Sequence, residues 1–160
     1  MKLIYLGLGT NLGDRRRNLA QAALRLDATD LSILRESSIY ETEPRDLLEQ
    51  PWFLNQVLEA ETSLFPRQLQ ARLQRVERML GKRPTVPKGP RLIDIDILLY
   101  GDTVVSTPEL EIPHPRMQDR RFVLEPLAEL APDVRHPQTG RTVREMLAEV
   151  AQQNIRRLSA

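Results

Sequence analysis

Residues 89–101 read Gly89-Pro90-Arg91-Leu92-Ile93-Asp94-Ile95-Asp96-Ile97-Leu98-Leu99-Tyr100-Gly101, an apolar segment with two aspartates two positions apart. Successive side chains of a β-strand point to opposite faces. A strand here therefore places Asp94 and Asp96 on one face and three isoleucines on the other. We expect the isoleucine face to lie in a core and the aspartate face to need a partner for its charge.

The two neighbouring carboxylates repel each other and resist desolvation, so a neutralising partner is expected. Mg²⁺ is the natural candidate, because it prefers oxygen ligands and binds through one or two carboxylates together with substrate phosphates. Arg91, three residues before Asp94, could then meet a phosphate. The alternative is a solvent-facing edge of a half-exposed strand, although aspartate is depleted in strands.

The chain upstream of this strand shows five further periodic segments. In order they predict a strand over 3–8, a helix from about Arg15 with Asp14 as its N-cap, a strand over 31–40, a strand over 53–62, and a helix from Pro66 that ends at Gly81. Residues 41–51 are expected to form a polar loop. The resulting βαββαβ order suits a split βαβ arrangement, in which two helices pack on one face of an antiparallel sheet and the other face is free for chemistry.

The last third of the chain predicts smaller elements. Short strands are expected near Val104 and Ile112, helical segments over 123–130 and 142–150, and fraying of the last residues. The predicted class is therefore α+β, with C-terminal short strands and helices added to the βαββαβ core.

The composition fits a single domain of residues 1–160, with 41% hydrophobic and 28% charged residues. Its 23 Lys and Arg against 22 Asp and Glu give a net charge of +1, which argues against nucleic acid or a membrane surface as a partner. The absence of cysteine excludes disulfides, thiolate metal sites and a cysteine nucleophile. Because the apolar start is too short for a signal peptide or a membrane span, we expect a cytoplasmic protein.

Residues 7–13, Gly7-Leu8-Gly9-Thr10-Asn11-Leu12-Gly13, follow a predicted strand and precede a helix, so a dinucleotide site must be weighed. The spacing is G-x-G-x-x-x-G rather than G-x-G-x-x-G, and the chain has no Walker A sequence. A structural turn is the favoured interpretation of these glycines.

Two basic regions could meet phosphates. Residues 82–90 place Lys82, Arg83 and Lys88 among prolines, as in a loop that closes over phosphates, although a solvated charge run is the alternative. Residues 113–122 combine His114 with three arginines in a turn-rich segment that suits oligophosphate oxygens. His136, in a polar loop, is expected at the surface.

Aromatic residues make up only 4% of the chain. Core packing is the ordinary explanation for each of Trp52, Phe53 and Phe122. Two of them could instead sandwich a flat ring, with Asn55 offering a donor and an acceptor to the edge of that ring.

Taken together, three separated motifs resemble 6-hydroxymethyl-7,8-dihydropterin pyrophosphokinase of folate biosynthesis. They are Gly89-Pro90-Arg91-x-x-Asp94-x-Asp96-Ile97, the upstream Gly7-x-Gly9-Thr10-Asn11-Leu12-Gly13-Asp14, and the downstream Pro113-His114-Pro115-Arg116-Met117 with Arg120-Arg121-Phe122-Val123-Leu124-x-Pro126-Leu127. Tyr40-x-Thr42-x-Pro44 and Phe53-Leu54-Asn55 extend the match to nearly the whole chain. The resemblance implies a ferredoxin-like α+β fold and transfer of pyrophosphate from ATP to the pterin hydroxymethyl group, which leaves AMP.

The resemblance also implies roles for individual residues. Catalysis would involve Asp94, Asp96, Arg91 and Arg83, with two Mg²⁺ ions held by Asp94 and Asp96. ATP, the co-substrate, would be bound by Gln74, Glu77, Arg83, Arg91, Ile97, His114 and Arg120. The pterin would be bound by Thr42, Pro44, Phe53, Asn55 and Phe122. A monomer with only these small-molecule partners is expected.

Two other functions remain open on the residues alone. Paired aspartates on an antiparallel sheet also suit a metal-dependent nucleotidyl transferase or cyclase. An RNA-binding module of the same fold is disfavoured, because Asp94 and Asp96 would repel a phosphate backbone.

Overall fold

The two longest strands, β1 (Lys2–Thr10) and β4 (Phe53–Thr62), pair in antiparallel fashion along their whole length, with Lys2 opposite Thr62. They form the centre of a six-stranded sheet in a computed structural model that describes residues 1–44, 49–81 and 92–158. The strand order is β5-β1-β4-β3-β8, and β2 also pairs with β4. The bounds of the outer strands are Asp94–Tyr100 for β5, Leu31–Glu36 for β2, Tyr40–Thr42 for β3 and Arg156–Arg157 for β8.

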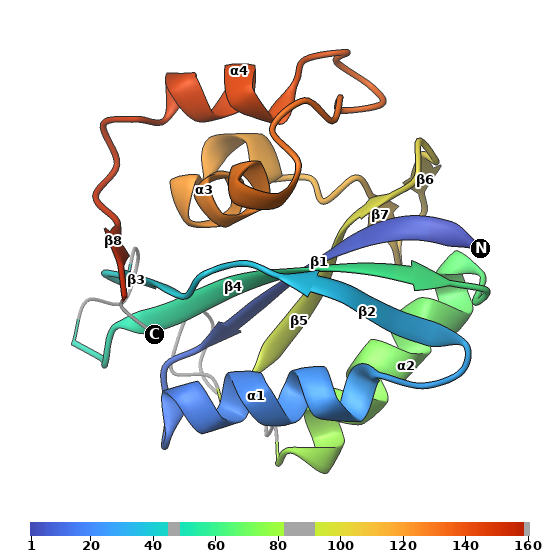
Figure 1. Cartoon of the computed structure of the whole chain (residues 1–160), viewed down its shortest axis with the longest axis horizontal. Coiled ribbons are helices and arrows are strands. Elements are labelled where there is room, and N and C mark those ends of the chain that lie inside the picture. The colour runs from blue at the N-terminus through green and yellow to red at the C-terminus, as the bar shows by residue number, and fades with distance from the viewer. Residues whose placement is uncertain (45–48, 82–91, 159–160) are drawn as a thin grey trace.

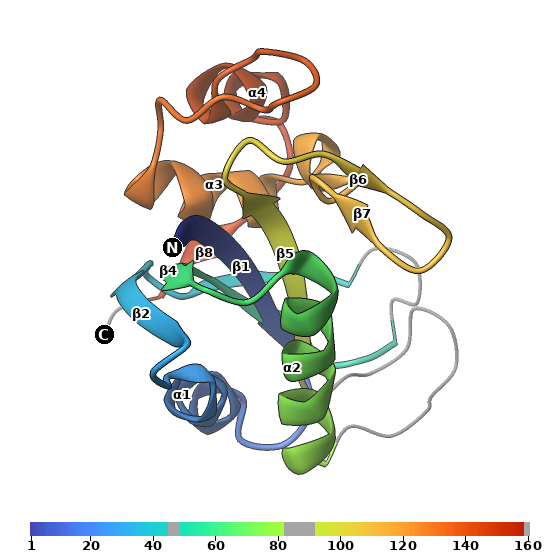
Figure 2. The same cartoon turned by 90° about the vertical axis from the view of Figure 1, so that its right-hand side faces the viewer.

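Two helices, α1 (Arg15–Leu26) and α2 (Pro66–Met79), cover one face of this sheet (Figures 1 and 2). The predicted start of α1 is confirmed, because the Asp14 carboxylate accepts a hydrogen bond from the Arg17 amide at 3.2 Å. The apolar side chains of both helices pack in one core with strand residues that include Leu6, Leu58 and Ile95. The predicted isoleucine face is thus buried, with Ile93 and Ile95 at 0% and 5% exposure.

The second face of the sheet is not free, which corrects the expectation of helices on one face only. Helices α3 (Arg121–Leu130) and α4 (Val143–Glu149) lie over part of it (Figure 1). A second core forms there, in which Leu124, Leu127 and Met146 pack against sheet residues that include Tyr5 and Val57. Among the described residues, the part of this face that α3 leaves uncovered lines a pocket that is open to a ligand.

A β-bulge in β5 builds that second core. The register to β1 shifts between Tyr5 and Leu6, so that Tyr5 lies opposite Leu99 and Leu6 opposite Ile97. The intervening Leu98 and its neighbour Leu99 therefore both pack in the second core, whereas Tyr100 returns to the first. Strict alternation along the sequence would have placed Leu99 with the isoleucines.

The predicted strand over 31–40 is in fact two strands, β2 and β3, separated at Ser37 and Ser38. The Ser37 hydroxyl accepts a hydrogen bond from the Val57 amide at 2.9 Å, and the Ser38 amide donates to the Glu129 carboxylate at 2.9 Å. Ser37 also donates its own amide to the Val57 carbonyl at 2.9 Å, so side-chain hydrogen bonds supplement the backbone bonding where the regular strand pairing is interrupted.

The predicted loop over 41–51 begins as strand, since Glu41 and Thr42 belong to β3. Glu41 is buried, and Arg15 and Arg156 both donate hydrogen bonds to its carboxylate. Burial raises the pKa of Glu41, but these two arginines outweigh that effect and the net shift is downward. Arg156 belongs to β8, which pairs with β3, whereas the last two residues, 159–160, lie outside the described residues.

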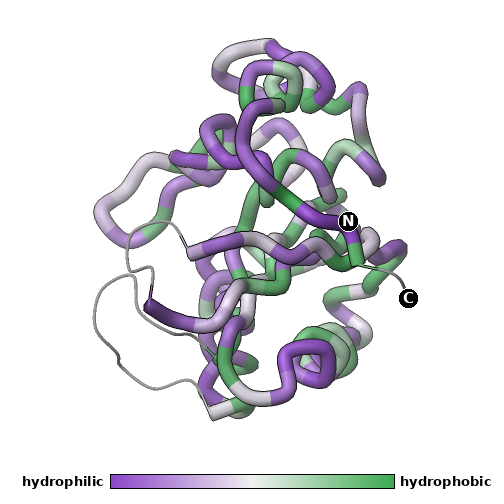
Figure 3. Tube along the Cα trace, turned by 90° about the vertical axis from the view of Figure 1, so that its left-hand side faces the viewer, coloured by the Kyte–Doolittle hydropathy of each residue, from purple (hydrophilic) through white to green (hydrophobic). Residues whose placement is uncertain are grey.

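A small hairpin, β6 (Val105–Ser106) and β7 (Glu111–Ile112), follows β5 and leads to a short 3₁₀ turn over Met117–Asp119. Figure 3 shows hydrophobic segments gathered through the middle of the molecule, where the sheet meets its two helical layers. In the described parts of the chain, no helix has both the length and the apolar character needed to span a bilayer.

Candidate active site

The open part of the second sheet face carries two rows of residues that run across three strands. In one row Asp94 of β5 lies opposite Gly9 of β1, which lies opposite Asn55 of β4. In the next row Asp96 lies opposite Gly7. Because neighbouring strands are about 5 Å apart, each aspartate stands beside a glycine that has no side chain. The two rows form the floor of a pocket.

The glycines provide space on this floor rather than a turn, which corrects the expectation for Gly7 and Gly9. Both lie inside β1, and a Cβ atom on Gly9 would come within 3.3 Å of Asn55 Oδ1. A Cβ on Gly7 would come within 3.2 Å of the Leu98 side chain. The turn function falls to Gly13, whose φ is +68°.

Aromatic and amide side chains surround this floor and form what we call the sheet-face pocket. Phe53 stands on β4 and Phe122 on α3, and both line the pocket with Thr42, Asn55, Asp94, Asp96, His114 and Arg120. The Asn55 amide donates to the Thr42 hydroxyl at 2.9 Å, which fixes the orientation of the amide. The Arg120 guanidinium lies 5.5 Å from the centre of the Phe122 ring. Apolar walls around a few fixed polar groups suit a flat, polar-edged ligand.

A second pocket, the edge pocket, is lined by residues of β5, of α2 and of the segment around the β6–β7 hairpin. Its lining includes Gln74, Glu77 and Ile97, all three predicted to face the nucleotide. Asp96 and His114 line this pocket and the sheet-face pocket alike. The two pockets therefore meet at a carboxylate and an imidazole.

Backbone groups on the outer edge of β5 form hydrogen bonds that hold Asp96 and His114 in place. The Ile95 amide donates to the Glu77 carboxylate at 2.7 Å, and the His114 amide donates to the Leu98 carbonyl at 3.1 Å. Glu77 thus fixes the backbone between the two aspartates, and Leu98 fixes the turn that carries the imidazole. An edge strand that would otherwise present unpaired backbone groups is here part of the site.

His114 is oriented toward Asp96. Its Nδ1 accepts a hydrogen bond from the Arg116 amide at 3.1 Å, so the neutral ring carries its proton on Nε2. Nε2 lies 4.0 Å from a carboxylate oxygen of Asp96. Burial lowers the pKa of His114; Asp96 opposes this shift and Arg120 adds to it, and the net direction is downward. A neutral imidazole whose Nε2–H faces the Asp96 carboxylate, beyond hydrogen-bond distance, is the favoured state near pH 7.

The remaining predicted site residues fall into two groups. Pro44 is buried next to β3 and is not among the residues that line either pocket. Arg83, Arg91 and the basic loop over 82–90 lie outside the described residues, so their roles stay predictions.

His136 is buried at 4% exposure rather than at the surface, because its Nδ1 accepts amide hydrogen bonds from Gln138 and Thr139 within its own loop. Trp52 is 45% exposed and lines neither pocket.

Several lining residues were missed from the sequence: Gly7, Gly9, Gln50, Val57, Leu98 and Val123. The glycines could have been found, because they share a parity in the first predicted strand that suits a ligand-facing side. Leu98 could have been found as well, since it shares the parity of Asp94 and Asp96 in the predicted strand.

Carboxylates at the junction of two pockets, on an α+β scaffold, are the arrangement of an enzyme that brings two substrates together. Residues 5–132 match the family of 7,8-dihydro-6-hydroxymethylpterin-pyrophosphokinase (HPPK). The chain belongs to this family, which confirms the resemblance found in its sequence.

Two bacterial relatives match over most of their own length. The 2-amino-4-hydroxy-6-hydroxymethyldihydropteridine pyrophosphokinase of Aquifex aeolicus is 41% identical over 149 residues, which cover 93% of this chain and 92% of the relative. The protein of that name from Bacillus subtilis is 41% identical over 155 residues, which cover 96% of this chain and 89% of the relative.

Other relatives are much longer. The folic acid synthesis protein fol1 of Pneumocystis carinii is 37% identical over 96% of this chain, and the chain spans only 21% of that relative's length. The crystal structure of Plasmodium falciparum HPPK-DHPS wild type with pteroate superposes with a TM-score of 0.76 at 18% identity, covering 94% of this chain and 42% of that one. At this identity the likeness shows the fold.

Proposed function

We propose that this chain transfers a pyrophosphoryl group from ATP to the hydroxymethyl group of 6-hydroxymethyl-7,8-dihydropterin, giving AMP and the pterin pyrophosphate in folate biosynthesis. The observation that carries the proposal is the meeting of two differently built pockets at Asp96 and His114. Family membership and the two bacterial relatives of similar length support it.

The sheet-face pocket is the proposed pterin site. Phe53 and Phe122 offer apolar surface to the faces of a flat heterocycle, and Asn55 with Thr42 offers polar groups to its edge. Gly7 and Gly9 leave room for the ring above β1. The hydroxymethyl group would then point toward Asp94 and Asp96 at the end of the same floor.

The edge pocket is the proposed nucleotide site, with Gln74, Glu77 and Ile97 in its lining. His114 stands where the triphosphate would pass from the edge pocket toward the pterin, and Arg120 lies on the far side of the junction. Arg83 and Arg91 are proposed to bind phosphate on the strength of the family resemblance.

Asp94 and Asp96 are proposed to hold Mg²⁺, two ions in all. The donor set fits this metal, because it consists of two carboxylates on one strand face that is open to a ligand. Among the residues that the structure describes, no group of three or more acidic or histidine side chains forms an all-protein cage. Phosphate oxygens and water would complete the coordination. When bound, Mg²⁺ supplies charge neutralisation and alignment for in-line displacement.

The protein's own residues hold the reacting groups in line. In the proposed step the pterin oxygen bonds to the β-phosphorus, the bond from that phosphorus to the oxygen shared with the α-phosphorus breaks, and the hydroxyl proton is released. Because the two pockets share one wall, they hold the pterin hydroxyl next to the β-phosphorus of ATP. Binding thus pays the entropic cost of bringing the two substrates together before the chemical step. The neutral His114 can donate a hydrogen bond to a phosphate oxygen without its own positive charge.

We further propose a ferredoxin-like arrangement for β1, β2, β4 and β5 with α1 and α2. The neighbour relationships β5-β1-β4-β2, all antiparallel, support it. A single pyrophosphokinase domain over 1–160, a monomeric state and a cytoplasmic location complete the proposal. Gel filtration with light scattering tests the monomer.

Product analysis tests the function. Purified protein is incubated with ATP, Mg²⁺ and the reduced hydroxymethylpterin, and nucleotides and pterins are separated by chromatography. AMP and pterin pyrophosphate in equal amounts support the proposal. ADP contradicts it, and release of free pyrophosphate with an adenylated pterin would establish nucleotidyl transfer instead.

A further inference from the structure

The start of α3 lacks the cap that helices ordinarily have. The N-cap position is Arg120, whose side chain makes no capping hydrogen bond. Ser, Thr, Asp or Asn is preferred at such a position because its oxygen accepts an exposed amide of the first turn. Arg120 instead lines the sheet-face pocket, 5.5 Å from the ring of Phe122.

The cap is supplied from the C-terminal tail. Gln153 Oε1 accepts a hydrogen bond from the Arg121 amide at 2.9 Å, and its Nε2 donates to the Asp119 carbonyl at 2.8 Å. These two backbone groups lie immediately before and after Arg120. One side-chain amide thus holds both peptides that flank the pocket arginine, as a paired strand would.

The contact is reciprocal. The Arg121 guanidinium donates to the backbone carbonyls of Ala151 and Gln153 at 2.9 and 2.8 Å. The backbone amide of Gln153 donates to the Val150 carbonyl at 3.0 Å. The turn over residues 150–153 is therefore held by hydrogen bonds to the helix start that it caps. From there the chain runs to β8 beside β3 (Figure 1).

We infer that Gln153 is a positioning residue for the pterin pocket: it caps α3 in place of Arg120 and thereby fixes Arg120 and Phe122 against the ligand. The inference rests on the proposed function for the identity of that ligand. Its physical basis is that an arginine side chain has no acceptor for the exposed amides of a helix start, so with Arg120 directed to the pocket another residue must supply the cap.

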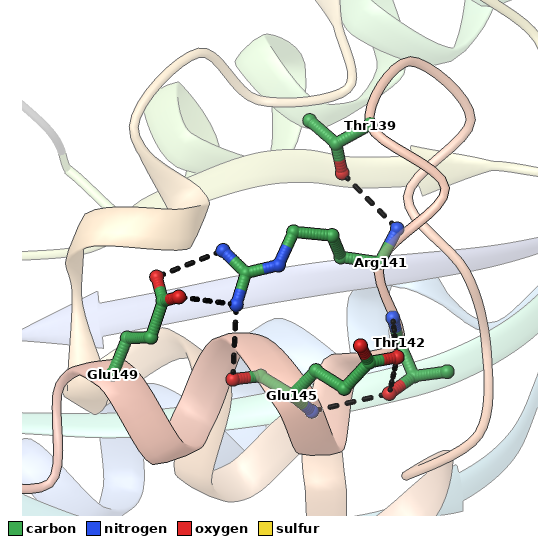
Figure 4. A network of polar contacts seen from close by, with 5 residues as sticks. All are labelled: Thr139, Arg141, Thr142, Glu145 and Glu149. Carbon is green, nitrogen blue, oxygen red and sulfur yellow. Dashed lines mark hydrogen bonds and ion pairs between the residues drawn. The ribbon is translucent and has the colours of Figure 1, made fainter.

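The test compares Gln153→Ala with a control variant that removes the N-terminal cap of a different helix, α4. Thr142 caps α4 through a hydrogen bond from the Glu145 amide at 3.1 Å, in a network with Arg141 and Glu149 (Figure 4). None of these residues lines either pocket. Thr142→Ala therefore removes a helix cap without touching the pterin site. Calorimetric titration with the pterin and thermal unfolding are measured for both variants and the parent protein.

We expect Gln153→Ala to raise the Kd for pterin about fivefold, the equivalent of one lost cap, whereas Thr142→Ala leaves it unchanged. Gln153→Glu keeps the acceptor for the Arg121 amide but loses the donor to the Asp119 carbonyl, so it should restore only part of the lost affinity. Equal pterin affinity in Gln153→Ala and the parent overturns the inference, and so does an equal loss in both cap variants.

A readout independent of the ligand separates this inference from the proposed function. Amide exchange of Arg121 and Phe122 should accelerate in Gln153→Ala and not in Thr142→Ala. If the parent protein binds no pterin, the proposed function fails, while the exchange data still decide whether Gln153 fixes the start of α3. Unchanged exchange refutes the positioning role.

Discussion

His114 Nε2 lies 4.0 Å from the carboxylate of Asp96, and these two residues form the shared wall of the two pockets. They come from different parts of the fold, since Asp96 stands on β5 and His114 on the turn after the β6–β7 hairpin. The hydrogen bond from the His114 amide to the Leu98 carbonyl connects the two elements. This junction is where the proposed chemistry takes place.

Asp96→Ala should abolish turnover and leave the fold intact. The side chain is 56% exposed, and removing one of two neighbouring like charges relieves repulsion, so the free energy of unfolding should change by less than about 0.5 kcal/mol. Loss of metal-assisted stabilisation should lower kcat on the order of 10³-fold. Asp102→Ala, an exposed aspartate in the turn after β5, is the control for kcat. Unfolding of Asp96→Ala would show that the aspartate pair is structural.

Phe122→Ala should weaken pterin binding about tenfold and leave ATP binding unchanged, because the ring is assigned to one pocket only. Separate titrations with the pterin and with a non-hydrolysable ATP analogue measure the two affinities. Phe65→Ala, at a residue that is 72% exposed and lines neither pocket, serves as the control. Pterin affinity equal to that of the parent would refute stacking on Phe122.

Gly9→Ala should narrow the floor of the sheet-face pocket. The new methyl group would lie 3.3 Å from Asn55 Oδ1, tighter than an ordinary contact, so the Asn55 amide that Thr42 holds in place must give way by a few tenths of an ångström. We expect the Kd for pterin to rise about tenfold, with unfolding shifted by no more than about 1–2 kcal/mol. If the affinity does not change, the pterin does not lie over Gly9.

His136 should make stability depend on pH. Burial lowers its pKa in the folded protein, so the unfolded chain binds more protons as the pH falls through the ordinary histidine range. Stability is therefore complete above about pH 6.5 and decreases below it. Denaturant unfolding between about pH 7.5 and 5.5 should show a shallower pH dependence for His136→Asn than for the parent. The same slope in both proteins would contradict a neutral, buried His136.

Most helices and strands could be predicted from the spacing of apolar residues, because this spacing shows which face of a strand or helix is buried. The shared face of Asp94 and Asp96, the parity of Phe53 with Asn55, and the capped start of α1 are such cases. The coverage of the second sheet face could not be predicted, since it depends on a one-residue bulge that places Leu98 and Leu99 on the same side.

Contacts between segments that are far apart in the chain could not be predicted from the sequence either. Nothing near Glu41 indicates that Arg156 binds its carboxylate, and nothing near Arg120 indicates that Gln153 caps the helix. The contact between Asp96 and His114 was not predicted either, because their separation along the chain leaves no local signal; the family resemblance only assigned one to the metal and the other to ATP.

Isotope transfer tests the central claim most directly. ATP labelled with ³²P at the β-phosphorus and, in a parallel reaction, at the γ-phosphorus is supplied with Mg²⁺ and the reduced hydroxymethylpterin, and the pterin product is isolated. Attack at the β-phosphorus predicts that both labels enter the pterin in equal yield and that AMP carries neither. Transfer of the γ-label alone, with the β-label retained in ADP, would contradict the account.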